Sequence, residues 1–184
     1  MTELVFCCDQ CLVKVSVGEL PSLYPEYVRH SVLSEDLGGR STEGTALFVA
    51  ATNSSRSWPD LVVALHFHPG PEAAFHPGIM LVPERGLLFI GAGTSLVAYK
   101  LSPVRRLWED TAEHGFWGWS RHGNIVFMSA ELEFAAWDIE GRKLWSSFVE
   151  PPWTYEVHGD QVTLDVMGRQ STFIAAIGPG SVVL

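Results

Sequence analysis

The stretch ELEFAAWDIEGRKLWSS spans Glu131–Ser147. Its pattern predicts a strand that ends in the Trp-Asp pair, a turn at Gly141 and a return strand that carries the Leu-Trp pair. We expect Asp138 to form hydrogen bonds within its own turn, as an Asp before a glycine turn does. The same arrangement occurs about 37 residues earlier, as SLVAYKLSPVRRLWED at Ser95–Asp110. A repeat of this kind predicts a β-sheet protein built from similar units.

The repeat continues through residues 79–184. Its first two units each contain four short apolar segments separated by turn residues, and its third unit contains three. Matching positions in the units are occupied by Phe89 and Phe127, by Trp108 and Trp145, and by glycines 86, 123 and 159. We therefore predict an all-β protein, an antiparallel meander of propeller-like four-stranded units. The units form either an incomplete or irregular propeller or a set of stacked sheets.

The segment WDIEGRKLW resembles the end of a WD-repeat blade, and it is equally similar to the quinoprotein-type (PQQ-like) repeat, in which a G-K-x-x-W return strand follows a strand. The resemblance covers about residues 79–177 and implies four-stranded blades. It also implies a protein-interaction platform or a cofactor-binding enzyme. Two complete units and one partial unit are too few to close a ring, because propellers have at least about four blades.

Residues 1–78 are predicted to form irregular N-terminal strands within the same single domain, 1–184. Apolar runs at Thr45–Thr52 and Leu61–Phe67 indicate buried strands. We expect at most one short helix, within Pro21–Leu37. The prolines at 21 and 25 confine that helix to the second part of the segment.

Composition limits the classes of partner. The formal net charge is -9, and the longest basic run is Arg105-Arg106, so we expect no nucleic-acid binding. No apolar run approaches the length of a membrane span, and the N-terminus lacks the features of a secretory signal. Three cysteines within five residues do not make a disulfide framework. These features together predict a cytoplasmic protein.

Those cysteines, Cys7, Cys8 and Cys11, have CxxC-like spacing and could supply three zinc ligands. The alternative, favoured because no second CxxC or nearby histidine follows, is that they are small buried hydrophobic residues of a strand.

The sharpest chemical hypothesis is a metal site at His66, His68 and Glu72. Residues two apart on a strand point the same way, so the two imidazoles can face one cavity. The HxHxxxE pattern resembles the first metal motif of the cupin barrels, which implies iron, manganese or nickel bound by nitrogen and oxygen ligands. The usual upstream glycine and the second cupin motif are missing. The alternative is a chance pair of histidines near a proline-rich loop.

A second hypothesis is a partner-binding surface made of Trp117, Trp119, Trp153 and Tyr155. Each pair alternates with small or polar residues, so we expect each pair to face one side of its strand. Exposed Trp and Tyr are effective anchors at interfaces. The alternative is that these rings pack between adjacent sheets.

The chain lacks GxSxG, P-loop and Rossmann patterns. We therefore expect a non-enzymatic protein without a cofactor that binds another protein or regulates it. A bacterial toxin-neutralising protein would fit the size and acidity. The alternative is a cupin-like metalloprotein or enzyme that uses the HxHxxxE motif.

Overall fold

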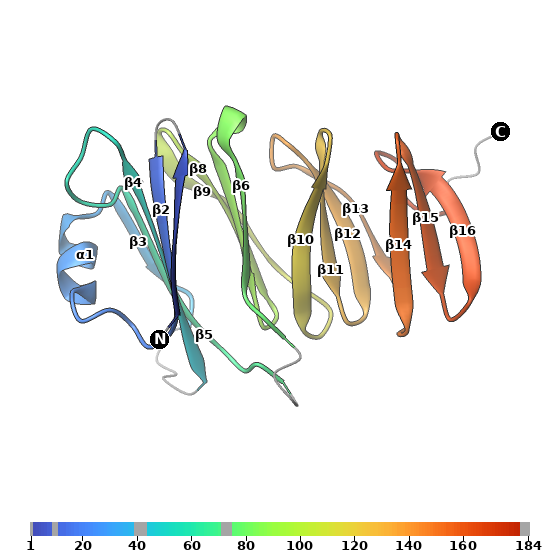
Figure 1. Ribbon diagram of the computed structural model, residues 1–184, viewed down its shortest axis with the longest axis horizontal. Helices are drawn as coiled ribbons and strands as arrows, with labels where there is room; N and C mark the ends of the chain where they lie inside the picture. Colours follow the sequence, from blue (N-terminus) through green and yellow to red (C-terminus); the bar gives the residue numbers. More distant parts are fainter. Residues whose placement is uncertain (1, 9–10, 39–43, 71–74, 181–184) are drawn as a thin grey trace.

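The computed structural model describes residues 2–8, 11–38, 44–70 and 75–180. Their strands form four sheets, named A to D here, which follow one another along the long axis of the molecule in chain order (Figure 1). Within the described residues the sheets make an open row and close no barrel. The predicted all-β, propeller-like class is confirmed.

Sheet A combines the strands of the N-terminal part in the order β1-β2-β4-β5-β3. Its strands are β1 (Thr2–Cys8), β2 (Cys11–Gly18), β3 (Leu33–Asp36), β4 (Thr45–Asn53) and β5 (Leu61–Phe67). All neighbours pair antiparallel except β3, which runs parallel to β5. The helix α1 (Tyr24–His30) covers the face of sheet A that is turned away from sheet B, where Tyr24 and Tyr27 pack against Phe48.

Sheets B, C and D correspond to the three repeat units and are simple antiparallel meanders. Sheet B contains β6 (Gly78–Val82), β7 (Leu87–Ala92), β8 (Ser95–Leu101) and β9 (Val104–Thr111), with the 3-10 helix η2 (Pro83–Arg85) after β6. Sheet C contains β10 (Phe116–His122), β11 (Ile125–Ala130), β12 (Glu133–Asp138) and β13 (Lys143–Phe148). Sheet D contains β14 (Trp153–His158), β15 (Gln161–Val166) and β16 (Arg169–Ile174), which matches the predicted third unit without its last strand.

The repeat explains how the sheets stack. Successive side chains of a strand point to opposite faces, so each unit presents one set of residues to the preceding sheet and another to the next. The positions that face the next sheet are filled by Phe89, Leu96 and Ala98 in sheet B and by Phe127, Phe134 and Ala136 in sheet C, all 0% exposed. The interfaces between sheets B and C and between sheets C and D are therefore apolar cores.

Sheet D departs from this pattern on its outer face. The three matching positions hold Thr163, Gln170 and Thr172, whereas its inner face packs Val162, Leu164 and Phe173 against sheet C. The two threonine hydroxyls lie 3.4 Å apart, and Gln170 donates to the Asp165 carboxylate. The outer face of sheet D therefore differs from the apolar faces that sheets B and C present to their next neighbours.

The tryptophans of the recurring Leu-Trp pairs connect neighbouring sheets. Trp108 of sheet B stacks on Trp137 of sheet C at 5.3 Å between ring centroids, and its indole N–H donates to the Gly141 carbonyl at 2.6 Å. One unit later, Trp145 donates to the Ala175 carbonyl at 2.7 Å and packs edge-on against Phe173. Each outermost tryptophan therefore ties its sheet to the end of the next one.

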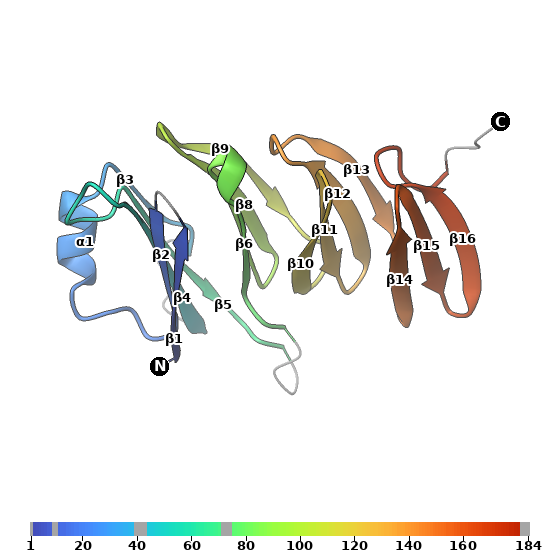
Figure 2. The same cartoon turned by 45° about the horizontal axis from the view of Figure 1, so that its top comes forward.

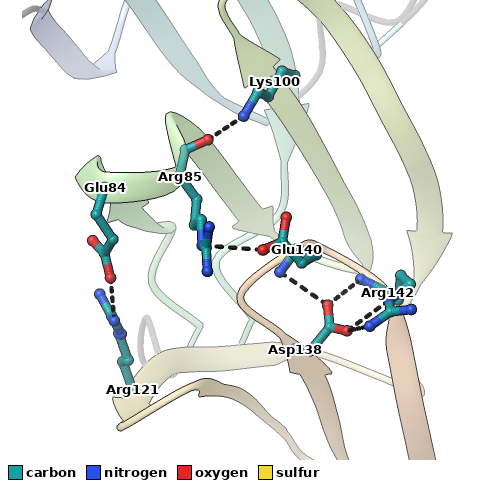
Figure 3. Close-up of polar contacts among 7 residues, drawn as sticks. All are labelled: Glu84, Arg85, Lys100, Arg121, Asp138, Glu140 and Arg142. Carbon is teal, nitrogen blue, oxygen red and sulfur yellow. Dashed lines mark hydrogen bonds and ion pairs between the residues drawn. The ribbon is translucent and has the colours of Figure 1, made fainter.

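Ion pairs join sheets B and C on the side of the molecule where η2 lies (Figure 3). Arg85 of η2 pairs with Glu140 at 3.0 Å, and Glu84 pairs with Arg121 of β10. The Arg85 carbonyl also accepts from Lys100. Most of these side chains are well exposed, so solvent screens the pairs and their contribution to stability is small.

Asp138 organises the turn between β12 and β13, as predicted for the Asp before the glycine turn. Its carboxylate accepts the backbone N–H groups of Glu140 and Arg142, both at 2.9 Å, and the Arg142 guanidinium at 2.7 Å. Burial by itself would raise the pKa of Asp138, but these hydrogen bonds and the Arg142 charge outweigh it and lower the pKa. The ionised form is therefore stabilised by folding.

This lowered pKa predicts a pH-dependent contribution to stability. It is present above the unfolded-state pKa of about 3.9 and is lost as the pH falls through the lower folded-state value. Asp138→Asn should cost roughly 0.5–1 kcal/mol at neutral pH, and the difference from wild type should shrink below about pH 3.5. Urea unfolding at neutral pH and below about pH 3.5 measures the stability difference between Asp138→Asn and wild type. Glu156→Gln, which changes an exposed carboxylate, is the control. An unchanged difference in acid would contradict this assignment.

The structure corrects the predicted helix. Helix α1 begins at Tyr24, with Pro25 in its first turn, where a missing N–H costs nothing. It ends at His30, and Leu33–Asp36 forms β3 instead of continuing the helix. The prolines therefore start the helix early and do not confine it to the second part of the segment.

Candidate functional site

The candidate site is β1, the edge strand of sheet A (Figure 2). Its pairing with β2 places Leu4 opposite Val15, Val5 opposite Lys14 and Phe6 opposite Val13. The apolar side chains nevertheless stay open to solvent: Leu4 is 54% exposed, Val5 52% and Phe6 43%. Because neighbouring residues point to opposite faces, β1 is apolar on both faces.

The position of β1 in the sheet explains this exposure. Val13 and Val15 of β2 belong to the core between sheets A and B and are at most 6% exposed. Leu4 and Phe6 lie on the same face of the sheet, one strand further out, where sheet B no longer covers them. The far edge of β1 pairs with no strand among the described residues.

Glu3 is the charged residue of β1. Its carboxylate pairs with Lys14 of β2 at 2.9 Å, across the face that also carries Val5. The hydrogen bond to Glu3 is the main cause that raises the pKa of Lys14, so the ammonium stays charged at neutral pH. The opposite face of β1 carries Leu4 and Phe6. None of the described β1 side chains on that face is charged.

Two other outer strands, β9 and β3, are protected by charges. Strand β9 carries Arg105, Arg106 and Glu109, and β3 carries Glu35 and Asp36. Glu35 also forms an ion pair with Arg106 of sheet B at 3.6 Å, and it accepts a hydrogen bond from the Tyr99 hydroxyl at 2.5 Å. Burial, and then the hydrogen bond to Glu35, raise the pKa of Tyr99, which keeps that hydroxyl protonated. Compared with these strands, β1 is the edge with an apolar surface.

Two of the three predicted metal ligands, His66 and His68, lie at the end of β5 and just beyond it. His66 is half-buried on the face of β5 opposite sheet B, and its Nδ1 is buried without a hydrogen-bond partner among the described residues. His68 is exposed, just beyond the end of β5, and Glu72 lies outside the described residues. In the described part of the chain, no three His, Cys, Asp or Glu residues gather as a metal site. The three-ligand site remains a prediction.

The four aromatic residues occupy two different interfaces. Trp119 packs against Phe89 of sheet B at 5.5 Å, whereas Trp117 stacks on Trp153 of sheet D at 5.4 Å. A register shift between Phe116 and Gly118 inserts Trp117 as a bulge. The prediction that Trp117 and Trp119 face the same side of their strand is therefore wrong, because a bulge breaks the two-residue alternation of side chains.

Trp153 and Tyr155 do share a face, and both pack against Phe134. Trp153 is 6% exposed and donates its indole N–H to the Glu131 carbonyl, while Tyr155 is half-buried beside Ser120. Of the four aromatic side chains, Trp117 is the most exposed to solvent, at 38%. A role of these four residues in partner binding stays a prediction.

Sequence reasoning did not single out β1. A signal was present, since TELVFCC combines three consecutive large apolar residues with a single charge. The sequence predicts irregular strands within residues 1–78, but it does not tell which of them lies at the edge of a sheet.

Comparisons with known proteins leave the family open. No family model and no curated protein sequence matches this chain. Among solved structures, Hsv2 from Kluyveromyces lactis is 10% identical, with a TM-score of 0.32 over 56% of this chain and 33% of that chain. Hsv2 from Kluyveromyces marxianus is 13% identical, with a TM-score of 0.28 over 53% and 36%. The likeness thus spans about a third of those chains and carries no functional argument.

The four-stranded antiparallel sheets have the form of propeller blades. In the part of the chain that the structure describes, no helix has the length and apolar character needed to cross a bilayer.

Proposed function

We propose that this chain is a non-enzymatic protein-binding protein and that β1 is its docking site. An extended segment of a partner protein would add to sheet A as a further strand beside β1. The observation that carries this proposal is the exposure of Leu4, Val5 and Phe6 on an open sheet edge. Strand addition combines backbone hydrogen bonds, which supply affinity, with side-chain contacts on both faces, which supply specificity.

The physical argument is that such an edge is costly to leave open. Unpaired N–H and C=O groups next to exposed apolar side chains promote association with other strands, and proteins usually suppress this with charges or prolines. Burying apolar surface is worth about 25 cal/mol per Å². A partner strand that covers Leu4 and Phe6 would therefore gain both pairing and apolar burial.

Charge indicates the chemistry of the partner. The chain carries a formal net charge of -9, so a second copy would be repelled, whereas a cationic partner would be attracted. On β1 itself, Glu3 lies on one face, and Leu4 and Phe6 lie on the other. We therefore expect a partner strand that alternates apolar and basic residues, with its basic residues beside Glu3.

The resemblance of WDIEGRKLW to WD-type repeats is consistent with a binding role, because that resemblance implies a protein-interaction platform. Neutralisation of a bacterial toxin is one form that this binding would take, with the toxin as the partner that supplies the strand. A cytoplasmic location fits the cysteine content.

A synthetic peptide tests the proposal. The acetylated and amidated peptide KVKVKVK, extended along β1, places its valines beside Leu4 and Phe6 and its lysines beside Glu3. We expect it to bind wild-type protein, and we expect Phe6→Lys to weaken binding by about tenfold or more, because the new charge repels the peptide and interrupts the apolar face. Fluorescence anisotropy of the labelled peptide measures the affinity.

Two controls make the result specific. Phe148→Lys changes an equally large ring on β13 that is 68% exposed, and it should leave the affinity unchanged. The acidic peptide EVEVEVE should bind more weakly than KVKVKVK. Equal affinities for wild type and Phe6→Lys would refute the role of β1. A concentration-dependent dimer that dissociates in Phe6→Lys would instead identify a second copy as the occupant.

A further inference from the structure

The pair Cys8 and Cys11 lies at the hairpin end of the first two strands. Cys8 is the last residue of β1, Cys11 is the first of β2, and the two are directly opposite each other. Directly opposed residues of antiparallel strands have Cα atoms about 4.5–5.5 Å apart, within the range of about 4.4–6.8 Å found for disulfides. The backbone therefore already has the spacing that a disulfide requires.

The sulfur atoms are also in contact. The two Sγ atoms lie 2.7 Å apart, and all three cysteines carry thiols. Cys7 is exposed, and it lies on the opposite face of β1 because neighbouring side chains of a strand alternate. The three cysteines considered as zinc ligands therefore do not share one face of the strand. Cys8 and Cys11 are in contact, and Cys7 lies on the other face.

This pair adjoins a small cleft. The cleft has a volume of about 60 Å³ and lies between sheets A and B, where Asn53 and Leu81 also contribute to its lining. Organic ligands typically occupy pockets of about 300–1,000 Å³. The cleft accordingly has room for a small group that approaches the sulfur atoms and not for a whole cofactor.

We propose that Cys8 and Cys11 form a thiol–disulfide exchange site whose co-reactant is a low-molecular-weight disulfide of the glutathione type. The Cys8 thiolate attacks one sulfur of the co-reactant, whose S–S bond breaks and releases one thiol after protonation. Cys11 then loses its proton and attacks the Cys8 sulfur, and the second thiol leaves with that proton. The protein dithiol is oxidised to a disulfide, and the co-reactant is reduced to two thiols.

The order of attack follows from the surroundings of the two sulfurs. Burial, followed by the hydrogen bond and the charge of the adjoining Cys8, raises the pKa of Cys11 to about 12. Cys11 therefore keeps its proton at neutral pH, while its sulfur stays in contact with the Cys8 sulfur. Since the thiolate is the attacking form, Cys8 is the residue that begins the exchange. The site is independent of whether β1 binds a partner strand.

Intact-mass analysis of the Cys7→Ser protein tests the inference, because this change removes the exposed thiol. Reduced protein is incubated with glutathione disulfide, and the remaining thiols are then alkylated. We expect both thiols to disappear with no retained glutathione, which leaves a monomer lighter by two hydrogens. Adding Cys11→Ser should trap one glutathione on Cys8. Adding Cys8→Ser instead should give an adduct on Cys11 that forms several-fold more slowly.

Three outcomes would overturn the inference: stable glutathione adducts on the Cys7→Ser protein, disulfides between molecules, or thiols that remain fully alkylatable. Circular dichroism of each variant, which confirms the strand content, separates a change in thiol chemistry from a loss of fold.

Discussion

Phe134→Ala should lower the free energy of unfolding by about 3–5 kcal/mol. Phe134 is 0% exposed at the interface between sheets C and D, where its ring contacts Phe127, Trp145, Trp153 and Tyr155 at centroid distances of 4.5–5.4 Å. Truncation to alanine removes the apolar transfer energy of the ring and leaves a cavity that stacked sheets cannot fill without moving apart.

A loss of this size is large against a typical total stability of about 5–15 kcal/mol. Urea unfolding followed by tryptophan fluorescence measures it directly, since two of the contacting rings are tryptophans. The matched control is Phe148→Ala on β13, which is 68% exposed and should change stability by less than about 0.5 kcal/mol. A loss below about 1 kcal/mol for Phe134→Ala would mean that the apolar contact between sheets C and D does not hold them together.

Replacing the polar outer face of sheet D should increase self-association of the protein. The triple variant Thr163→Phe, Gln170→Leu and Thr172→Ala reproduces on sheet D the residues with which sheet B contacts sheet C. In sheet B these side chains are fully buried, whereas on sheet D they would face solvent. Exposed apolar patches on sheet faces drive association.

Sedimentation analysis over a range of concentrations measures this effect. The polar control Thr163→Ser, Gln170→Asn and Thr172→Ser should behave like wild type. A triple variant that stays folded and associates no more than wild type at high concentration would show that the polarity of these three positions does not control self-association.

The repeat could be predicted from the sequence because it depends on residues close together in the chain. Turn glycines such as Gly123 and Gly159, and packing residues such as Phe127 and Trp145, recur at a fixed spacing and report the meander directly. The predicted strands in residues 79–177 accordingly match β6 to β16 closely. The turn role of Asp138 followed from the same local chemistry.

Features that depend on distant partners were harder to predict. The parallel strand β3 forms because Leu33–Asp36 lies beside β5, about 28 residues later in the chain, and no local pattern encodes that pairing. The bulge at Trp117 reversed the side to which that ring points, which a strict two-residue period does not anticipate. The exposure of β1 depends on where sheet B ends, and the sequence of β1 carries no information about that boundary.

Amide hydrogen exchange of β1 with and without the peptide KVKVKVK tests the central claim most directly. Backbone N–H groups of a strand point alternately to its two sides, so a strand added beside β1 protects every second β1 amide, while amides that already donate to β2 change little. The account predicts this alternating protection over residues 3–7, and its absence in Phe6→Lys. Protection around Trp117, with β1 amides unchanged, would contradict the account.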